Sequence, residues 1–256
     1  AEVAEARKEL GGDFYKAFKS MESTNPVKYG EMRSLGKKVN FSTEYGAQAP
    51  KLAQTLMISE SDAQLYIDAR EESLTVAKAW KEKVVVQQAH EQGFVRSRLG
   101  AKRHLAEALD SGQGYIASKA KRQAVNFRIQ GSCAEQTKLA EARMWQQDLF
   151  TGKFDATCIG PIHDEVVSSV ALKDLFKFLK LKHECMCANY AGMEVPVVSS
   201  IAVGPNFYDQ VELGESSNIE DIVKALEAQK AGYEKRENKF MADFCDKLLN
   251  LAKEEL

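Results

Sequence analysis

The spacing of apolar residues changes once along the chain, near residue 150. Before this point they recur every three or four positions, as on one face of a helix. After it, two short β-branched runs, 156–162 and 165–170, flank the pair His163-Asp164, which is typical of two antiparallel strands joined by a tight turn. A helix over 173–190 and a third strand over 195–203 are expected to follow. The pattern predicts an α+β fold, with a mainly helical first part and a small antiparallel sheet carrying packed helices.

Turn and capping residues set the expected helix bounds. Gly46 and Gly93 are expected to end helices over 29–45 and 59–92, because glycine readily adopts the left-handed conformation that follows a helix. Ser59 precedes Asp62 by three positions and is the expected N-cap of the second of these helices. Further helices are expected over 1–10, 14–20, 49–56 and 115–149, a basic hairpin or loop over 94–105, and a C-terminal helical extension after residue 213 that begins with the N-cap Asn218.

The overall charge places a limit on how the chain could bind nucleic acid. Its 256 residues are 44% apolar and 28% charged, as in an ordinary globular protein, and the formal net charge is only −2. A DNA-binding surface would therefore have to be a local basic patch. Such a patch is predicted, with contact to a phosphate backbone as its use and a solvated loop as the alternative, from Arg96, Arg98, Lys102, Arg103, Lys119, Lys121, Arg122 and Arg128.

Cysteine usage and hydropathy indicate where the protein resides. None of the five cysteines forms a C-x-x-C pair, so the sequence indicates neither a disulfide framework nor a strong zinc site. The spacing His183-x-Cys185-x-Cys187 would split three side chains between two faces of a helix, which favours an unliganded group over zinc. No apolar run approaches the ~20 residues that span a membrane. These features predict a soluble protein of a reducing compartment, namely the cytoplasm of a bacterial or phage-infected cell, with an organelle as the alternative.

Four side chains on the first long helix are expected to form a surface that is cationic at one end and aromatic at the other. Arg33, Lys37, Phe41 and Tyr45 are spaced by four, so they follow one slowly drifting face of a helix. Two cations at one end suit a triphosphate, and two aromatic rings at the other offer stacking area to a base or sugar. Taken alone, the pattern is more simply explained by a solvated basic stripe followed by two core aromatics.

Two further motifs follow in the chain. Arg122, Asn126 and Gln130 are again spaced by four, and one cation with two amides could reach phosphates and minor-groove acceptors. Polar decoration of an exposed helix is the simpler explanation of that triplet. His163, Asp164 and Glu165 lie at the expected hairpin turn, where the two carboxylates could hold a hard divalent cation through oxygen. A turn that merely favours aspartate is the alternative there.

Together, and in this order, the three motifs resemble those of the family A (polymerase I-like) DNA polymerases. The strings are R-S-L-G-K-K-V-N-F-S-T-E-Y-G from Arg33, R-Q-A-V-N-F-R-I-Q-G from Arg122 and I-H-D-E-V from Ile162. The resemblance runs from about residue 13 to 209, where G-P-N-F-Y-D is similar to the end of many members, and Asp13-Phe14-Tyr15 takes the place of an Asp-x-His element.

The resemblance implies a role for each motif residue. Arg33 and Lys37 would contact the phosphates of an incoming dNTP, Phe41 would pack on its sugar and base, and Tyr45 would lie at the insertion site. Arg122, Asn126 and Gln130 would contact primer–template DNA. Asp164 would bind Mg²⁺ with Glu165 as its auxiliary neighbour, and His163 would contact the primer-terminal phosphate. Lys37, Asp164 and Glu165 would be the catalytic set in this chain. The implied subdomains are fingers over 1–113, with the dNTP-binding helix at about 29–46, a palm part over 114–213, and the extension over 214–256.

The sequence also departs from the family pattern. The strand that carries the first metal-binding aspartate is missing and by family spacing would precede Ala1, as would the thumb. We therefore expect an upstream portion, either a separate chain of a split polymerase or a segment that has been removed. Pro161 stands where relatives often have glutamine, and Ser42-Thr43-Glu44 replaces a glycine and an apolar pair. The apolar stripes of the extension predict a helical hairpin packed on its own palm, with a docking surface as the alternative.

The function expected from the resemblance is template-directed DNA synthesis by two-metal phosphoryl transfer, as the C-terminal portion of a polymerase. The partners would be primer–template DNA, dNTPs and the upstream portion, with Mg²⁺ as cofactor and no membrane. The main alternative is a non-catalytic DNA- or nucleotide-binding remnant that acts as a replication accessory subunit. A related single-subunit RNA polymerase is disfavoured by Phe41 and by the H-D-E form of the third motif.

Overall fold

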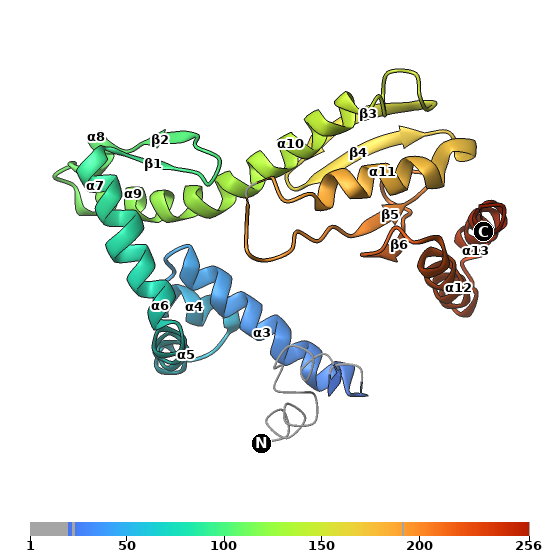
Figure 1. The fold of residues 1–256 in the computed structure, drawn as a ribbon. Helices are drawn as coiled ribbons and strands as arrows, with labels where there is room; N and C mark the ends of the chain where they lie inside the picture. The colour runs from blue at the N-terminus through green and yellow to red at the C-terminus, as the bar shows by residue number, and fades with distance from the viewer. Residues whose placement is uncertain (1–19, 22–23, 191, 256) are drawn as a thin grey trace. The chain divides into compact units, whose positions relative to one another are not determined.

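The computed structural model describes residues 20–21, 24–190 and 192–255. Expectations for 1–10, for Asp13-Phe14-Tyr15 and for all but the last residue of 14–20 lie outside the described residues. The chain forms two compact units, one comprising residues up to Val95 with Lys102–Asn126, and the other Arg96–Ala101 with Phe127–Leu256. Each unit is described by itself (Figure 1). Helices dominate the first unit and the second combines helices with small antiparallel sheets, so the predicted α+β class is confirmed.

The first unit begins with helices whose ends follow the predicted capping residues. Helix α3 (Pro26–Glu44) has Asn25 as N-cap, and Gly46 follows its C-cap residue Tyr45 with φ +84°. Helix α4 (Ala49–Leu56) has the predicted bounds. Helix α5 (Glu60–Ser73) is capped by Ser59, whose hydroxyl accepts from the Asp62 backbone N–H at 3.1 Å. The three helices enclose a small core made of Val39, Ala49, Leu52, Ala53 and Ala63.

The prediction of one long helix over 59–92 is wrong in detail. After α5 the backbone leaves the helical region at Leu74, and α6 (Thr75–Ala79), the π-helical turn η1 (Trp80–Val86) and α7 (Gln87–Gln92) follow. The break and the π turn coincide with Thr75-Val76 and with three consecutive valines, whose branched side chains crowd the preceding helical turn. Gly93 ends α7 with φ +72°, as predicted.

A hairpin and further helices follow along the chain. Strands β1 (Phe94–Arg96) and β2 (Lys102–His104) confirm the predicted basic hairpin, and the rings of Phe94 and His104 lie 5.8 Å apart. Helices α8 (Ala106–Leu109) and α9 (Gly114–Asn126) follow. The helix predicted over 115–149 exists, but it contains the π-helical turn η2 (Phe127–Gly131) before α10 (Ser132–Gln146), and the two units meet in sequence at that turn.

In the second unit, the predicted hairpin has the bounds that the sequence indicates. Strands β3 (Ala156–Ile162) and β4 (Glu165–Val170) are antiparallel, with Ile162 opposite Glu165 and a register shift between Cys158 and Gly160. The short turn η3 (Leu172–Asp174) leads into α11 (Leu175–Cys187), and Figure 1 shows α10 and α11 beside this hairpin. Phe178 of α11, Val166 of β4 and Met144 of α10 share one buried cluster.

The third predicted strand is shorter than expected. Only Ile201–Val203 (β5) is a strand, and it pairs with β6 (Val211–Gly214) rather than with the β3–β4 hairpin. Among the described residues after α10 there are therefore two separate two-stranded sheets. Pro196 cannot donate a ladder hydrogen bond, and Val195 and Val198 are largely exposed, so residues 195–200 gain little from joining a sheet.

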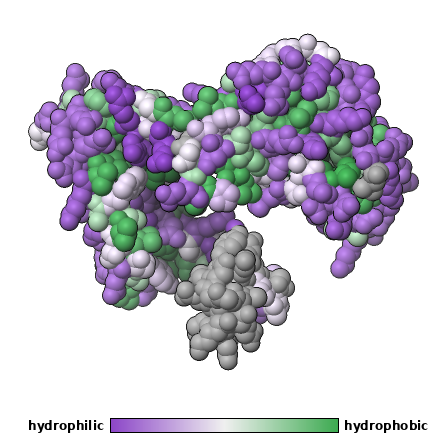
Figure 2. Space-filling view, in the orientation of Figure 1, coloured by the Kyte–Doolittle hydropathy of each residue, from purple (hydrophilic) through white to green (hydrophobic). Residues whose placement is uncertain are grey.

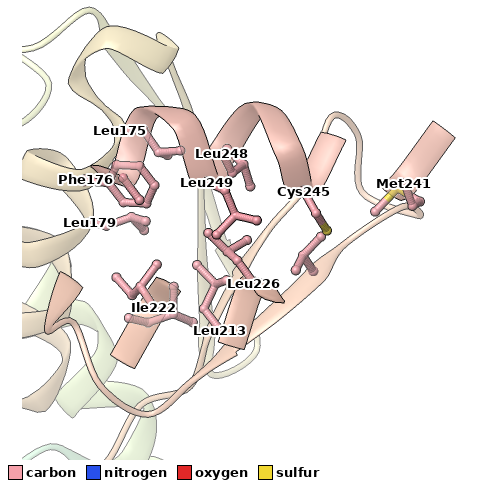
Figure 3. Close-up of a cluster of buried hydrophobic side chains, with 13 residues drawn as sticks. Leu175, Phe176, Leu179, Leu213, Ile222, Leu226, Met241, Cys245, Leu248 and Leu249 are labelled. Atoms are coloured by element: carbon pink, nitrogen blue, oxygen red, sulfur yellow. The ribbon is translucent and has the colours of Figure 1, made fainter. Parts of the chain in front are cut away.

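The C-terminal extension consists of α12 (Ile219–Lys235) and α13 (Lys239–Lys253), and the predicted N-cap Asn218 accepts from the Glu220 backbone N–H. Its apolar side chains point toward α11 and β6 in one cluster (Figure 3). The extension therefore packs on the preceding part of its own chain, as predicted. The members of this cluster are Leu175, Phe176, Leu179, Ile201, Val211, Leu213, Ile222, Leu226, Met241, Cys245, Leu248, Leu249 and Ala252.

The surface is mixed. Figure 2 shows that hydrophilic residues cover most of the visible face, with smaller apolar areas between them. Among the described residues, no helix is both long enough and apolar enough to cross a membrane.

Candidate functional site

Helix α3 and its C-cap residue carry the predicted nucleotide-binding side chains. Phe41 and Tyr45 are 58% and 54% exposed, which rules out the simpler explanation that they are core aromatics. Lys37 is exposed and Arg33 is half-buried. Val39 on the other side of α3 is buried against α4 and α5. The helix is therefore fixed through one face and offers two cations and two rings on another.

Gly46 lies where the first two motifs contact each other within the first unit. Gly46 follows the end of α3 with φ +84°, and a Cβ at this position would lie 2.3 Å from Cδ of Arg122 on α9. No side chain fits in that space without displacing Arg122, and the positive φ also favours glycine. The end of the α3 motif and the first residue of the second motif are thus in close contact.

A carboxylate on the last turn of α3 pairs with two cations. Oε2 of Glu44 accepts from Nη2 of Arg70 on α5 at 2.7 Å and from Nζ of Lys81 on η1. Nε of Arg70 also donates to Oδ1 of Asn40 at 2.9 Å. Partial burial alone would raise the pKa of the Glu44 carboxyl, but the hydrogen bonds and charges of Lys81 and Arg70 together outweigh it and lower that pKa.

The third motif occupies the two-residue turn between β3 and β4. His163, Asp164 and Glu165 are all exposed, and Glu165 opens β4 opposite Ile162. His163 has φ +59°, a left-handed conformation that is uncommon for a residue other than glycine. Such conformations cluster at functional sites, where the surrounding structure holds them. His163 and Asp164 form the turn and Glu165 is the first residue of β4, so the three exposed residues lie together at one end of the hairpin.

A half-buried lysine holds the strand that follows this turn. Nζ of Lys182 on α11 donates to the carbonyl of Val166 at 2.5 Å and to Oγ of Ser168 at 3.1 Å, two residues of β4. Burial lowers the pKa of Lys182 to about 8, against a smaller opposing effect of Cys158. Cys158 of β3 donates in turn to Oε1 of Glu141 on α10 at 3.4 Å. Both strands of the hairpin are therefore tied to the helices behind them.

The second motif spans both units. Arg122 and Asn126 are exposed on α9 in the first unit, and Gln130 is exposed on η2 in the second. Part of the predicted basic patch contacts protein backbone: Nη1 of Arg96 donates to the Gly100 carbonyl, and Nη1 of Arg128 to the Arg96 carbonyl. The remaining basic residues of the patch are exposed, and contact with DNA stays a prediction.

The donor atoms of the third motif fit part of a divalent-cation site. Asp164 and Glu165 carry the oxygen donors that Mg²⁺ prefers, and both are exposed. Across 20–21, 24–190 and 192–255, no group of three or more His, Cys, Asp or Glu side chains is placed to hold a metal ion.

The histidine–cysteine motif on α11 divides between two faces, as its spacing predicts. Nε2 of His183 lies 3.1 Å from the Ser199 carbonyl and 3.3 Å from Sγ of Cys187. The Cys185 thiol is buried on another side, where it donates to Oε1 of Gln147 at 3.6 Å and burial raises its pKa. The three side chains therefore do not converge on one point.

Two features of the site escape sequence reasoning. Arg70 and Lys81 lie 26 and 37 positions from Glu44, so their pairing depends on tertiary structure. The sequence marks Glu44 only as a departure from the family pattern. The role of Lys182 is equally hidden, because a lysine on an amphipathic helix is normally read as solvated.

The chain is similar to known DNA polymerases over most of its length. The profile described as DNA polymerase family A matches residues 6–209. DNA polymerase I of Bacillus subtilis (strain 168) is 33% identical over 178 residues, which are 70% of this chain and 20% of that protein. The thermostable DNA polymerase I of Thermus aquaticus is 26% identical over 191 residues, 75% of this chain and 22% of that protein.

A solved structure agrees with these matches. The POL domain of Pol1 from M. smegmatis, in complex with DNA primer-template and dNTP, superposes with a TM-score of 0.60 and 27% identity over 77% of this chain and 34% of that one. The chain spans about a fifth of the length of the two curated relatives. Since the family profile covers well over half of its residues, this chain belongs to DNA polymerase family A.

Proposed function

We propose that this chain takes part in template-directed DNA synthesis, as the C-terminal portion of a family A polymerase. The observation that carries the proposal is that side chains of all three motifs are exposed, within a stretch that matches the family throughout. Exposed rings on α3 have little structural reason to remain uncovered unless a ligand stacks on them. The M. smegmatis relative, solved with primer-template DNA and dNTP, supports DNA and dNTPs as the partners.

The proposed roles follow the chemistry of each side chain. Arg33 and Lys37 bind the triphosphate through charge-assisted hydrogen bonds, and Phe41 and Tyr45 contact the sugar, the base and the insertion site. Arg122, Asn126 and Gln130 contact the primer–template, and His163 contacts the primer-terminal phosphate. Lys37, Asp164 and Glu165 form the catalytic set of this chain. We assign fingers to 1–113, the palm part to 114–213 and the extension to 214–256.

Asp164 would hold Mg²⁺, with Glu165 as its neighbour. When bound, the ions supply the charge stabilisation on which phosphoryl transfer depends. The carboxylates described in this chain provide part of the ligand set, so we infer that an upstream portion contributes the first aspartate and the thumb. That portion is either a separate chain or part of a longer protein. The exposed turn at Asp164 gives such a portion free access to the metal-binding side chains.

Primer extension with Mg²⁺ and dNTPs tests the proposal, first with this chain alone and then with a polypeptide that carries the upstream strand and thumb. We expect synthesis only in the mixture. Asp164→Asn should abolish synthesis and leave DNA affinity within about twofold, because its carboxylate serves the metal rather than the duplex. Asp155→Asn, an exposed aspartate beside the same hairpin, is the matched control and should retain activity.

The other outcomes discriminate between the remaining explanations. DNA binding without synthesis in every mixture would favour the non-catalytic accessory subunit. Synthesis by the chain alone would mean that a carboxylate of this chain replaces the upstream aspartate. Incorporation of ribonucleotides in preference to deoxyribonucleotides would favour an RNA polymerase.

A further inference from the structure

The last turn of α3 is held by two residues of other elements, Arg70 and Lys81. Oε2 of Glu44 accepts hydrogen bonds from Arg70 and Lys81, and Arg70 also holds Asn40. Asn40 and Glu44 are four residues apart and therefore lie one above the other on α3. We call Asn40, Glu44, Arg70 and Lys81 the α3 latch. It links three elements of the first unit: α3, α5 and η1.

The latch is partly shielded from solvent. The side chains of Glu44, Arg70 and Lys81 are 28%, 16% and 24% exposed, so water screens these ion pairs less than it screens pairs on an open surface. By contrast, the pair between Lys78 and Glu71 nearby is about half exposed on both sides. A shielded carboxylate that loses its cations would be left without charge compensation, which makes the latch hard to open.

The latch lies on the same turn as the proposed nucleotide-binding rings. Phe41 follows Asn40, and Tyr45 follows Glu44, so each ring stands about 100° around the helix from a latch residue. The backbone N–H of Tyr45 donates to the Phe41 carbonyl, and those of Gly46 and Ala47 to Thr43 and Ser42. These are the terminal hydrogen bonds of α3, where a helix frays most easily.

The π-helical turn gives the latch a second anchor. Lys81 belongs to η1, and π turns occur mostly as single insertions at functional positions because their geometry is less favourable than that of an α-helix. A π turn displaces the following side chains around the helix axis. In this protein, Lys81 of the π turn donates a hydrogen bond to Glu44.

We propose that Glu44 is a positioning residue for nucleotide binding, which fixes the last turn of α3 through Arg70 and Lys81 and so holds Phe41 and Tyr45 in place. The inference rests on the proposed function, because it assigns the two rings to the nucleotide. Glu44 itself would not touch the nucleotide.

Hydrogen exchange of the chain without ligands tests the mechanical part. Glu44→Gln keeps the shape of the side chain and removes its charge. We expect the amides of Tyr45, Gly46 and Ala47 to exchange roughly tenfold faster in this variant, because charged hydrogen bonds of this kind restrain local opening. Glu31→Gln, an exposed carboxylate at the other end of α3, is the matched control and should leave these amides unchanged. Equal exchange in Glu44→Gln and the wild type would overturn the proposal.

Steady-state kinetics of the assembled polymerase test the functional part. Glu44→Gln should raise the KM for dNTP roughly tenfold while the Kd for primer–template changes little, since a misplaced binding surface weakens nucleotide capture. Lys81→Met should have a similar effect, and the double variant should be no worse than either single variant, because both disrupt one interaction.

The two readouts separate the possible failures. Faster exchange with an unchanged KM would leave the latch a purely structural feature and overturn the positioning role. A wild-type mixture that makes no DNA would count against the proposed function, and the exchange comparison, which needs neither DNA nor dNTP, would still decide whether Glu44 holds the turn.

Discussion

A buried ammonium group lies behind the hairpin that carries Asp164. Lys182 satisfies two of its donors on β4, and burial lowers its pKa to about 8 from an ordinary value of 10.5. The charged form is therefore less favourable in the folded state than in the unfolded state. Below pH 8 both states carry the proton and the full cost of burying the charge is present. Between about pH 8 and 10.5 the folded state loses the proton first, so folding stability rises with pH in this window.

Replacing Lys182 with methionine removes this pH dependence. Relative to the variant, the wild type should gain up to about 3 kcal/mol of unfolding free energy between pH 8 and 10.5. Urea denaturation of both proteins at pH 7.5, 9 and 10 measures the difference. Lys180→Met, an exposed lysine of the same helix, is the control and should track the wild type. If the difference in unfolding free energy between the wild type and Lys182→Met were constant across this pH range, the predicted effect of Lys182 would be contradicted.

Two glycines of one segment should respond to alanine in opposite ways. Gly46 has φ +84° and no room for a Cβ beside Arg122, so Gly46→Ala should cost about 1–3 kcal/mol of stability. It should also weaken DNA binding by displacing Arg122. Gly36 lies inside α3 with nothing within 4 Å of an added Cβ, and Gly36→Ala should stabilise by about 0.5–1 kcal/mol. Thermal unfolding of both variants checks the pair, and equal shifts of Tm would rule out a special role for Gly46.

At the scale of elements, local signals predict what local chemistry controls. The bounds of α4 and the N-caps Ser59 and Asn218 follow from capping residues within a few positions of each helix end. The β3–β4 hairpin follows from β-branched runs around a tight turn. The prediction of an unbroken helix over 59–92 is wrong because the spacing of apolar residues carries no information about crowding between neighbouring branched side chains. Close to such residues, the helix is interrupted at Leu74 and in η1.

In the candidate site, too, local features can be predicted from the sequence, whereas tertiary contacts cannot. The spacing of four correctly indicates a helix, since Arg33, Lys37 and Phe41 lie on α3 and Tyr45 is its C-cap residue. The α3 latch and the contact of Gly46 with Arg122 join residues far apart in sequence, and a single sequence without tertiary contacts holds no sign of them. Strand pairing has the same limit, since β5 pairs with β6 and both strands share a buried cluster with α12 and α13, which lie further along the chain.

Helix α13 provides a direct test of the packing in Figure 3. Leu248 is fully buried, whereas Phe240 on the same helix is 59% exposed. Leu248→Ala should therefore destabilise the chain by about 2–5 kcal/mol through lost burial and the cavity that remains. Phe240→Ala should change stability by less than about 0.5 kcal/mol, despite the larger side chain. Chemical denaturation followed by circular dichroism measures both, and similar losses would show that the two faces of α13 are equally packed.

At the scale of the molecule, the family match and the folded unit end at different places. The match ends at residue 209, but the core cluster of the second unit draws more than half of its members from α12 and α13. One side of α11 packs on β4 and α10. Its other side carries Leu175, Phe176 and Leu179, and the extension covers these side chains, which would otherwise be exposed to water. The extension is thus a structural part of the second unit, although it lies beyond the segment that matches the family.

Removing residues 215–256 should therefore disrupt the second unit. The truncated chain would expose a contiguous apolar surface on α11, β5 and β6, and surfaces of that kind drive aggregation. We expect a loss of cooperative urea unfolding, an increase in binding of a hydrophobic dye, and oligomers on a sizing column. Protection of α3–α5 amides from exchange should persist, because the core of the first unit contains no residue of the extension. A truncated chain that stays monomeric and unfolds cooperatively would show instead that the palm is stable alone, and the extension would then be free to serve as the docking surface that its sequence also allows.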